Sequence, residues 1–146
     1  MRESIGSTRV FRRLGILFGA VLTCVLAHGP AVAADWPQEP TPTTTAASWE
    51  LIDKNLAQLE SMIQAGKIGN LGSSAYGIAN AFKALAGLSA SLPADKLAAV
   101  QGDVKVVGSE VSKLDKAGEH NDAAGVQSHL RALKATLAGV RGYYQH

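Results

Sequence analysis

The sequence predicts an all-α protein, an up-down-up-down antiparallel four-helix bundle that follows a removable amino-terminal signal. Apolar residues recur at alternating steps of three and four in four consecutive segments, a spacing that lines them up along one side of a helix. The connections between these segments are only a few residues long, so each helix has to turn back on its neighbour. We therefore divide the chain into a signal over 1–34, a flexible Pro/Thr-rich leader over 35–47 and a bundle over 48–146.

Residues 1–34 have the parts of a secretion signal. Basic residues up to Arg13 precede an apolar run over 14–27, and small residues over 31–34 follow where a signal peptidase cuts. The apolar run is shorter than the roughly 20 residues that a membrane-spanning helix needs. We expect cleavage after the third or fourth of the small residues, a periplasmic mature protein, and membrane contact only through the signal before cleavage.

Removal of this signal changes the charge and the chemistry of the chain. Four of the 14 Lys and Arg residues and one of the 12 Asp and Glu residues lie in the signal, so the mature part carries ten basic residues against eleven acidic ones. It contains no basic block of the kind that nucleic-acid binding requires. The only cysteine, Cys24, also leaves, which excludes disulfides, cysteine nucleophiles and covalent haem attachment in the mature protein.

The mature chain opens with a Pro- and Thr-rich stretch over 36–45 that lacks a periodic apolar pattern, and we expect it to be an extended, flexible tether. The first helix is predicted to start after Ser48 as its N-cap and to close at Gly66. Its apolar stripe consists of Trp49, Ile52, Leu56, Leu59 and Ile63.

The remaining three helices are predicted from the same spacing. The second is expected to continue up to Pro93, the third to end at Gly118, and the fourth to begin after Asn121 as its cap. Their stripes are Leu71, Ala75, Ile78, Phe82, Leu85, Leu88 and Leu92; then Leu97, Val100, Val104, Val107, Val111 and Leu114; then Val126, Leu130, Leu133, Leu137, Val140 and Tyr144. The seven-residue repeat favours near-antiparallel, coiled-coil-like packing.

Two segments resemble the soluble periplasmic b-type cytochromes and the related c′ cytochromes. Residues 49–56 (Trp-Glu-Leu-Ile-Asp-Lys-Asn-Leu) are similar to the first helix of that family, where a haem-ligating methionine is followed by Glu and then by Asn-Leu. Residues 133–145 are similar to the last helix, where Tyr-His-Gln supplies the other ligand. The resemblance implies the four-helix fold, with Trp49 at the methionine position and Tyr144 at the histidine position.

Neither Trp49 nor Tyr144 can act as that pair of haem ligands, so the haem function is not carried over and no cofactor is expected. Both residues belong to the apolar stripes, and the start of the first helix lies at the same end of such a bundle as the finish of the fourth. We expect the two rings to fill the volume that a haem-binding relative leaves for its cofactor.

One candidate metal site lies at the turn between the third and fourth helices. Glu119, His120 and Asp122 gather there in the sequence, with Asp115 one helical turn earlier, and carboxylates and imidazoles are ligands that divalent ions accept. The competing interpretation is a solvated turn whose carboxylates cap the helices.

The sequence favours a non-enzymatic periplasmic binding, accessory or stress-related protein, which contacts another protein or a second copy of itself. Four serines lie at helix ends without a nucleophile-elbow frame, namely Ser73, Ser74, Ser89 and Ser91. Paired carboxylates at the spacing of di-iron bundles are missing, so we expect no enzymatic activity. A metal- or haem-handling protein is the alternative. A third hypothesis is a subunit whose chemistry belongs to its partner.

Overall fold

The computed structural model describes residues 39–144, and over these residues the protein is helical without any strand, as the sequence predicts. The predicted signal over 1–34 lies outside the described residues. No helix within 39–144 combines the length and the apolar character needed to span a membrane. The elements are, in order, α1 (Thr45–Gln64), the 3-10 helix η1 (Ile68–Asn70), α2 (Gly72–Gly87), α3 (Ala94–Glu119), α4 (Ala123–Arg141) and the 3-10 helix η2 (Gly142–Tyr144).

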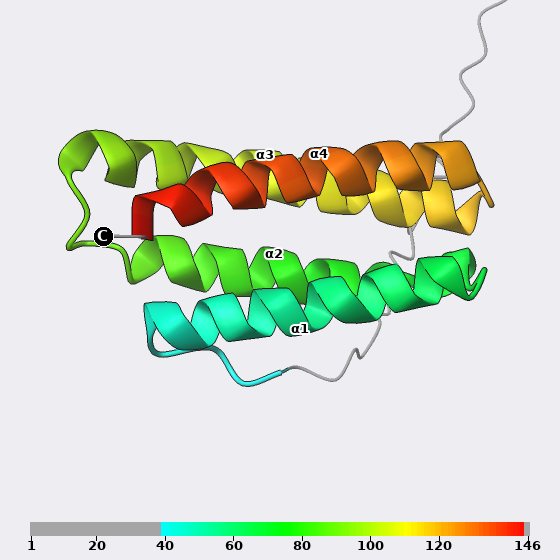
Figure 1. Ribbon diagram of the computed structural model, residues 1–146, viewed down its shortest axis with the longest axis horizontal. Coiled ribbons are helices and arrows are strands. Elements are labelled where there is room, and N and C mark those ends of the chain that lie inside the picture. Colours follow the sequence, from blue (N-terminus) through cyan, green and yellow to red (C-terminus); the bar gives the residue numbers. More distant parts are fainter. Residues whose placement is uncertain (1–38, 145–146) are drawn as a thin grey trace, which may run out of the picture. The chain divides into compact units, whose positions relative to one another are not determined.

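The four long helices lie side by side along the longest axis of this unit (Figure 1). α1 packs against α2, α2 against α3, and α3 against α4. Long side chains connect α1 and α4: Arg141 pairs with Asp53 at 2.6 Å, and Lys134 pairs with Glu60. Residue numbers therefore fall along α4 as they rise along the facing α1.

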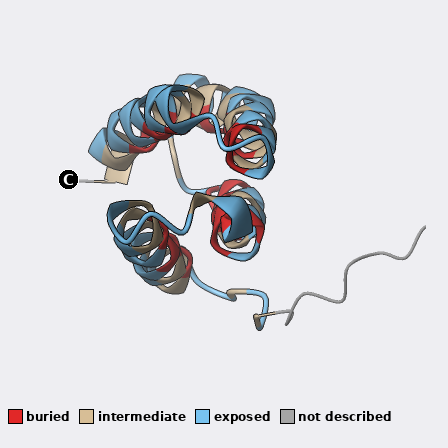
Figure 2. Ribbon diagram, turned by 90° about the vertical axis from the view of Figure 1, so that its right-hand side faces the viewer, coloured by how far each residue is buried: buried red, intermediate tan, exposed pale blue. Residues whose placement is uncertain are grey.

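The apolar stripes form the core. Buried residues lie on the sides of the helices that face one another (Figure 2). The largest of them is Phe82 on α2, which is 0% exposed. The predicted stripe residues that are buried include Ile52, Leu59, Leu71, Ala75, Ile78, Phe82, Leu85, Val100, Val107, Val111, Leu114, Val126, Leu130, Leu133, Leu137 and Val140. At one end of the bundle burial is incomplete: Trp49 and Tyr144 are only half-buried.

The second helix is shorter than predicted. It ends at Gly87, and Leu88 is its C-cap, with its backbone N–H donating to Ala84 O and Leu85 O. The chain then makes a turn in which Leu92 N donates to Ser89 O at 3.0 Å. Leu88 is consequently 36% exposed, so its prediction as a core residue is wrong.

The first helix starts four residues earlier than predicted, because Thr44 and not Ser48 is its N-cap. Thr44 is extended and its hydroxyl accepts a hydrogen bond from Ala47 N at 3.1 Å, the bond that an N-cap provides. Ser48 is buried inside the first turn, where its hydroxyl donates to Thr44 O at 3.0 Å. Residues 45–47, predicted as part of the leader, therefore belong to α1.

The fourth helix is also capped by a neighbour of the predicted residue. Asp122 Oδ1 accepts from Gly125 N at 2.9 Å, so Asp122 is the N-cap. Asn121 has a positive φ of 55° and reverses the chain between α3 and α4. The prediction for Gly66 holds: it follows the end of α1 with a φ of 71°, a conformation that glycine adopts without strain.

Candidate functional site

Residues 39–44, which we call the strap, lie against α1 and α2. The carboxylate of Glu39 holds the strap at its first described residue: Oε1 accepts from Lys54 Nζ at 2.6 Å and Oε2 accepts from Asn55 Nδ2 at 2.8 Å. Within the described part of the chain, no backbone hydrogen bond joins residues 39–43 to a helix. The side chain of Glu39 therefore supplies the polar attachment of residues 39–43, while Thr44 is bound to α1 as its N-cap.

Asn55 is a buried amide on the inner side of α1. It is 4% exposed, and its Nδ2 group also donates to Leu51 O at 3.0 Å, which orients the amide toward the strap. A Cβ atom at position 77 of α2 would lie 2.8 Å from Asn55 Oδ1, so the side chain has room only because Gly77 is glycine. The close approach of α1 and α2 at this point creates the seat for Glu39.

The hydrogen bonds to Glu39 stabilise its ionised form. The bond from Lys54 is the larger cause and the bond from Asn55 the smaller, and together they hold the pKa of the Glu39 carboxyl below its ordinary value of 4.5. Glu39 is therefore a carboxylate at neutral pH.

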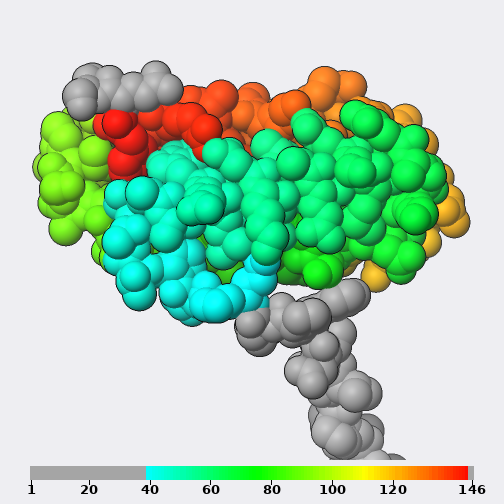
Figure 3. All heavy atoms as spheres, turned by 60° about the horizontal axis from the view of Figure 1, so that its bottom comes forward, coloured from blue at the N-terminus to red at the C-terminus, as the bar shows by residue number. Residues whose placement is uncertain are grey.

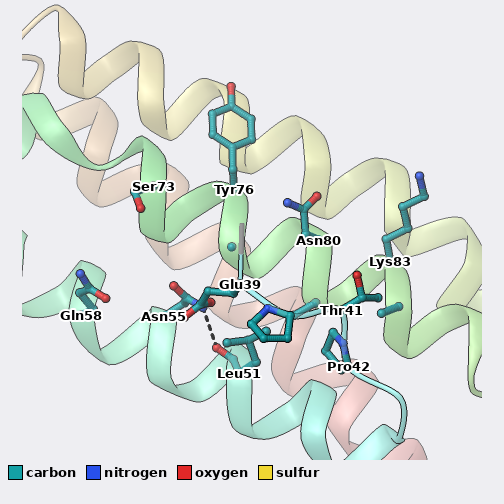
Figure 4. A pocket seen from close by; sticks show the side chains of 14 residues that line it. Glu39, Thr41, Pro42, Leu51, Asn55, Gln58, Ser73, Tyr76, Asn80 and Lys83 are labelled. Carbon is teal, nitrogen blue, oxygen red and sulfur yellow. Dashed lines mark hydrogen bonds between the residues drawn. The ribbon is translucent and has the colours of Figure 1, made fainter. Parts of the chain in front are cut away.

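A cleft of about 590 Å³ lies between the strap, α1 and α2. The strap, coloured cyan, borders a hollow in the face shown in Figure 3. In Figure 4, Asn55 and Gln58 of α1 lie opposite Ser73 and Asn80 of α2, while Tyr76 and Lys83 extend from α2 away from the strap. The apolar part of the wall consists of Pro40, Pro42, Leu51, Ala81 and Ala84.

The chemistry of the cleft is that of hydrogen bonding beside an apolar wall. The side chains of Gln58, Ser73 and Asn80 are neutral, exposed groups that can each donate and accept hydrogen bonds. Glu39, the one carboxylate in the wall, is already bound by two donors. Such an arrangement suits the binding of a polar ligand with some apolar surface more than proton transfer.

Trp49 and Tyr144 come together at one end of the bundle. Their ring centroids are 5.7 Å apart with the planes at 78°, an edge-to-face contact. The guanidinium of Arg141 lies 4.4 Å from the centroid of the Trp49 ring, and the Tyr144 hydroxyl is hydrogen-bonded to the buried Ser89. Polar contacts as well as ring packing therefore hold Trp49 and Tyr144 in place at this end of the bundle.

The predicted metal ligands Glu119, His120 and Asp122 do not form a metal-binding cluster in the described part of the chain. Within 39–144 there is no group of three or more His, Cys, Asp and Glu side chains placed to hold a metal ion. Glu119 and His120 are exposed, and the side chain of Asp122 caps α4. Asp115 is partly buried beside Gly72 at the start of α2, and this burial, with the nearby charge of Glu119, raises the pKa of its carboxyl.

Sequence reasoning did not find the cleft. The residue that could have indicated the cleft is Asn55, a polar residue on the inner side of α1. It lies between Ile52 and Leu59, both of which are buried. A polar residue in such a stripe needs a partner. The partner, Glu39, lies 16 residues earlier in a segment whose composition indicates a tether, and no local pattern connects the two.

No family model matches the chain, and comparisons with curated proteins and with solved structures find no match. The resemblance to the periplasmic cytochromes therefore stays a prediction.

Replacing Glu39 by glutamine should make the stability of the protein less dependent on pH. Because the folded-state pKa of Glu39 lies below 4.5, its stabilising effect is complete above that pH and is lost as the pH falls through the lower folded-state value. Because the ion pair is exposed, we expect the free energy of unfolding of the wild type to exceed that of Glu39→Gln by at most about 1 kcal/mol at pH 7. This difference should disappear in acid.

Urea unfolding of both proteins between pH 7 and pH 3 measures this difference. Glu50→Gln is the matched control, because Glu50 is exposed on α1 and forms no ion pair within residues 39–144. A Glu39→Gln difference that stays constant over this pH range would contradict the role of the carboxylate.

Proposed function

We propose that the protein is exported to the periplasm and that its mature form is an up-down-up-down antiparallel four-helix bundle. Export is supported by the signal pattern over 1–34. The topology is supported by the pairs Asp53–Arg141 and Glu60–Lys134, whose numbers run in opposite directions along α1 and α4. The mass of the protein recovered from the periplasm tests export: it should lack residues 1–33 or 1–34, and an intact chain there would contradict cleavage.

The proposed function is that of a non-enzymatic binding or accessory protein, with the cleft as its binding site. The observation that carries this proposal is the set of side-chain amides and hydroxyls that face a cleft of about 590 Å³ between the strap, α1 and α2. Volumes of this order are typical of ligand sites, which combine an apolar wall with a few polar groups that orient the ligand. The Glu39 carboxylate in the wall supports a binding role over a catalytic one, because it already accepts hydrogen bonds from Lys54 and Asn55.

Filling the cleft should abolish binding while the fold is kept. Asn80 is an exposed residue of α2 in the wall, so Asn80→Trp would place an indole ring in the cleft without disturbing the core. Ser128→Trp is the matched control, because Ser128 is an exposed residue of α4 outside the cleft wall. We expect small amide, alcohol and carboxylate fragments to bind the wild type and the control, and to lose binding to Asn80→Trp.

Saturation-transfer NMR with such a fragment library measures this binding. Circular dichroism of the three proteins checks that the helices are intact. The proposed function would be wrong if no fragment bound, or if every fragment that bound the wild type bound Asn80→Trp equally well.

A further inference from the structure

The strap occupies its position in the manner of a weakly bound peptide. Its carboxylate is matched by an ammonium group at 2.6 Å and an amide at 2.8 Å, whereas residues 39–43 make no backbone hydrogen bond to a helix within the described part of the chain. The partner ammonium, Lys54, is 64% exposed along its side chain, and exposed ion pairs of this kind contribute little to stability. The strap is therefore attached specifically but can be displaced at low cost.

The seat of the carboxylate is built more firmly than the strap itself. Asn55 is buried and its orientation is set by the bond to Leu51 O, and the space for it depends on Gly77 of the neighbouring helix. A buried amide that donates to a carboxylate gives a directional bond, and the ionised acceptor makes that bond stronger than a neutral one. The bond to Leu51 O and the contact with Gly77 do not involve the strap, so they hold Asn55 in place when the strap leaves.

The cleft also extends past the part of the wall that the strap covers. Gln58 and Ser73 face it from α1 and α2 beyond Glu39, and Asn80 faces it from about two turns further along α2 (Figure 4). Side-chain amides and hydroxyls at such spacing can pair with the backbone groups of an extended chain. A segment that used both the carboxylate seat and these groups would make more contacts than the strap does.

We infer that the cleft is a docking site for an extended, proline-containing acidic segment of a partner protein, and that the strap occupies the carboxylate seat of this site in the free protein. The occupant is argued from the strap itself, whose Glu-Pro-Thr-Pro sequence shows which chemistry the seat accepts. The partner segment places a carboxylate on Lys54 and Asn55 and displaces the strap. This inference rests on the proposed function, because it names the ligand class of the same cleft.

A peptide with the sequence of the strap tests the inference. The probe is acetyl-Glu-Pro-Thr-Pro-Thr-Thr-amide, and the control probe carries Gln in place of Glu. Both are titrated into the wild type and into Glu39→Gln, and the side-chain amide signals of Asn55 are followed by two-dimensional NMR. Glu39→Ala serves as a second variant of the same kind, and circular dichroism confirms that each variant is folded.

We expect Glu39→Gln to bind the acidic peptide up to about fivefold more tightly than the neutral peptide, because only the acidic peptide offers a carboxylate to Lys54 and Asn55, and exposed ion pairs contribute modestly. The wild type should bind the acidic peptide more weakly than the variant, since its own strap competes at a high effective concentration. Adding Lys54→Met to Glu39→Gln should reduce the preference for the acidic peptide and leave the part that the Asn55 hydrogen bond supplies.

The inference is overturned if both peptides bind Glu39→Gln equally, if neither binds, or if the shifted signals lie away from the cleft. If fragments still bind in a manner sensitive to Asn80→Trp, these outcomes leave the proposed function standing. If the fragments also fail to bind, both conclusions fail together.

Discussion

Phe82→Ala is expected to lower the free energy of unfolding by about 3–5 kcal/mol, the range for truncating a large aromatic ring in a well-packed core. Phe82 is the largest of the fully buried side chains within residues 39–144 and is 0% exposed. It lies on α2, which packs against both α1 and α3. A single domain is stabilised by only about 5–15 kcal/mol, and the loss is therefore a large share of the total.

Urea unfolding followed by circular dichroism gives this free energy directly. Phe82→Leu is the control, because leucine keeps most of the volume and should cost less than alanine. A cost below about 1 kcal/mol for Phe82→Ala would show that the ring is not packed as described, since truncating a large core side chain to alanine costs about 2–5 kcal/mol.

The second large effect concerns two glycines of α3 whose replacement by alanine should change stability in opposite directions. At Gly118 the added Cβ would overlap the carbonyl oxygen of Ile68 in η1, and the side chain of Leu71 lies 3.4 Å away. The obstacle is backbone, which cannot rotate aside as a side chain can. We expect Gly118→Ala to destabilise the protein by about 1–3 kcal/mol, the usual cost of overpacking.

Gly102 is the matched control on the same helix. It is exposed, and nothing lies within 4 Å of the place where its Cβ would be. Gly102→Ala should therefore stabilise the protein by about 0.5–1 kcal/mol, because alanine loses less backbone freedom than glycine when a helix forms. Thermal unfolding of the two variants under one condition measures the contrast, and two changes of the same sign would contradict the close contact between α3 and η1.

The helices and the core could be predicted because their signal is local. In the stripe from Val126 to Val140, apolar residues recur about once in every helical turn. This spacing places them on one face of the helix, and that face is buried wherever the partner helix lies. Helix ends were predicted less well. Thr44 and Ser48 are both good N-cap residues, and only the path of the chain before the helix decided that Thr44 accepts the bond.

The sequence by itself determined an all-α protein with four helices, their positions to within a few residues, and most of its core. Tertiary structure alone decided that the strap lies on α1 and α2 and that Glu39 meets Lys54 and Asn55. The physical reason is the range of the interactions. Helix periodicity acts between residues three and four apart, whereas the seat for Glu39 forms only when a second helix brings Gly77 against Asn55.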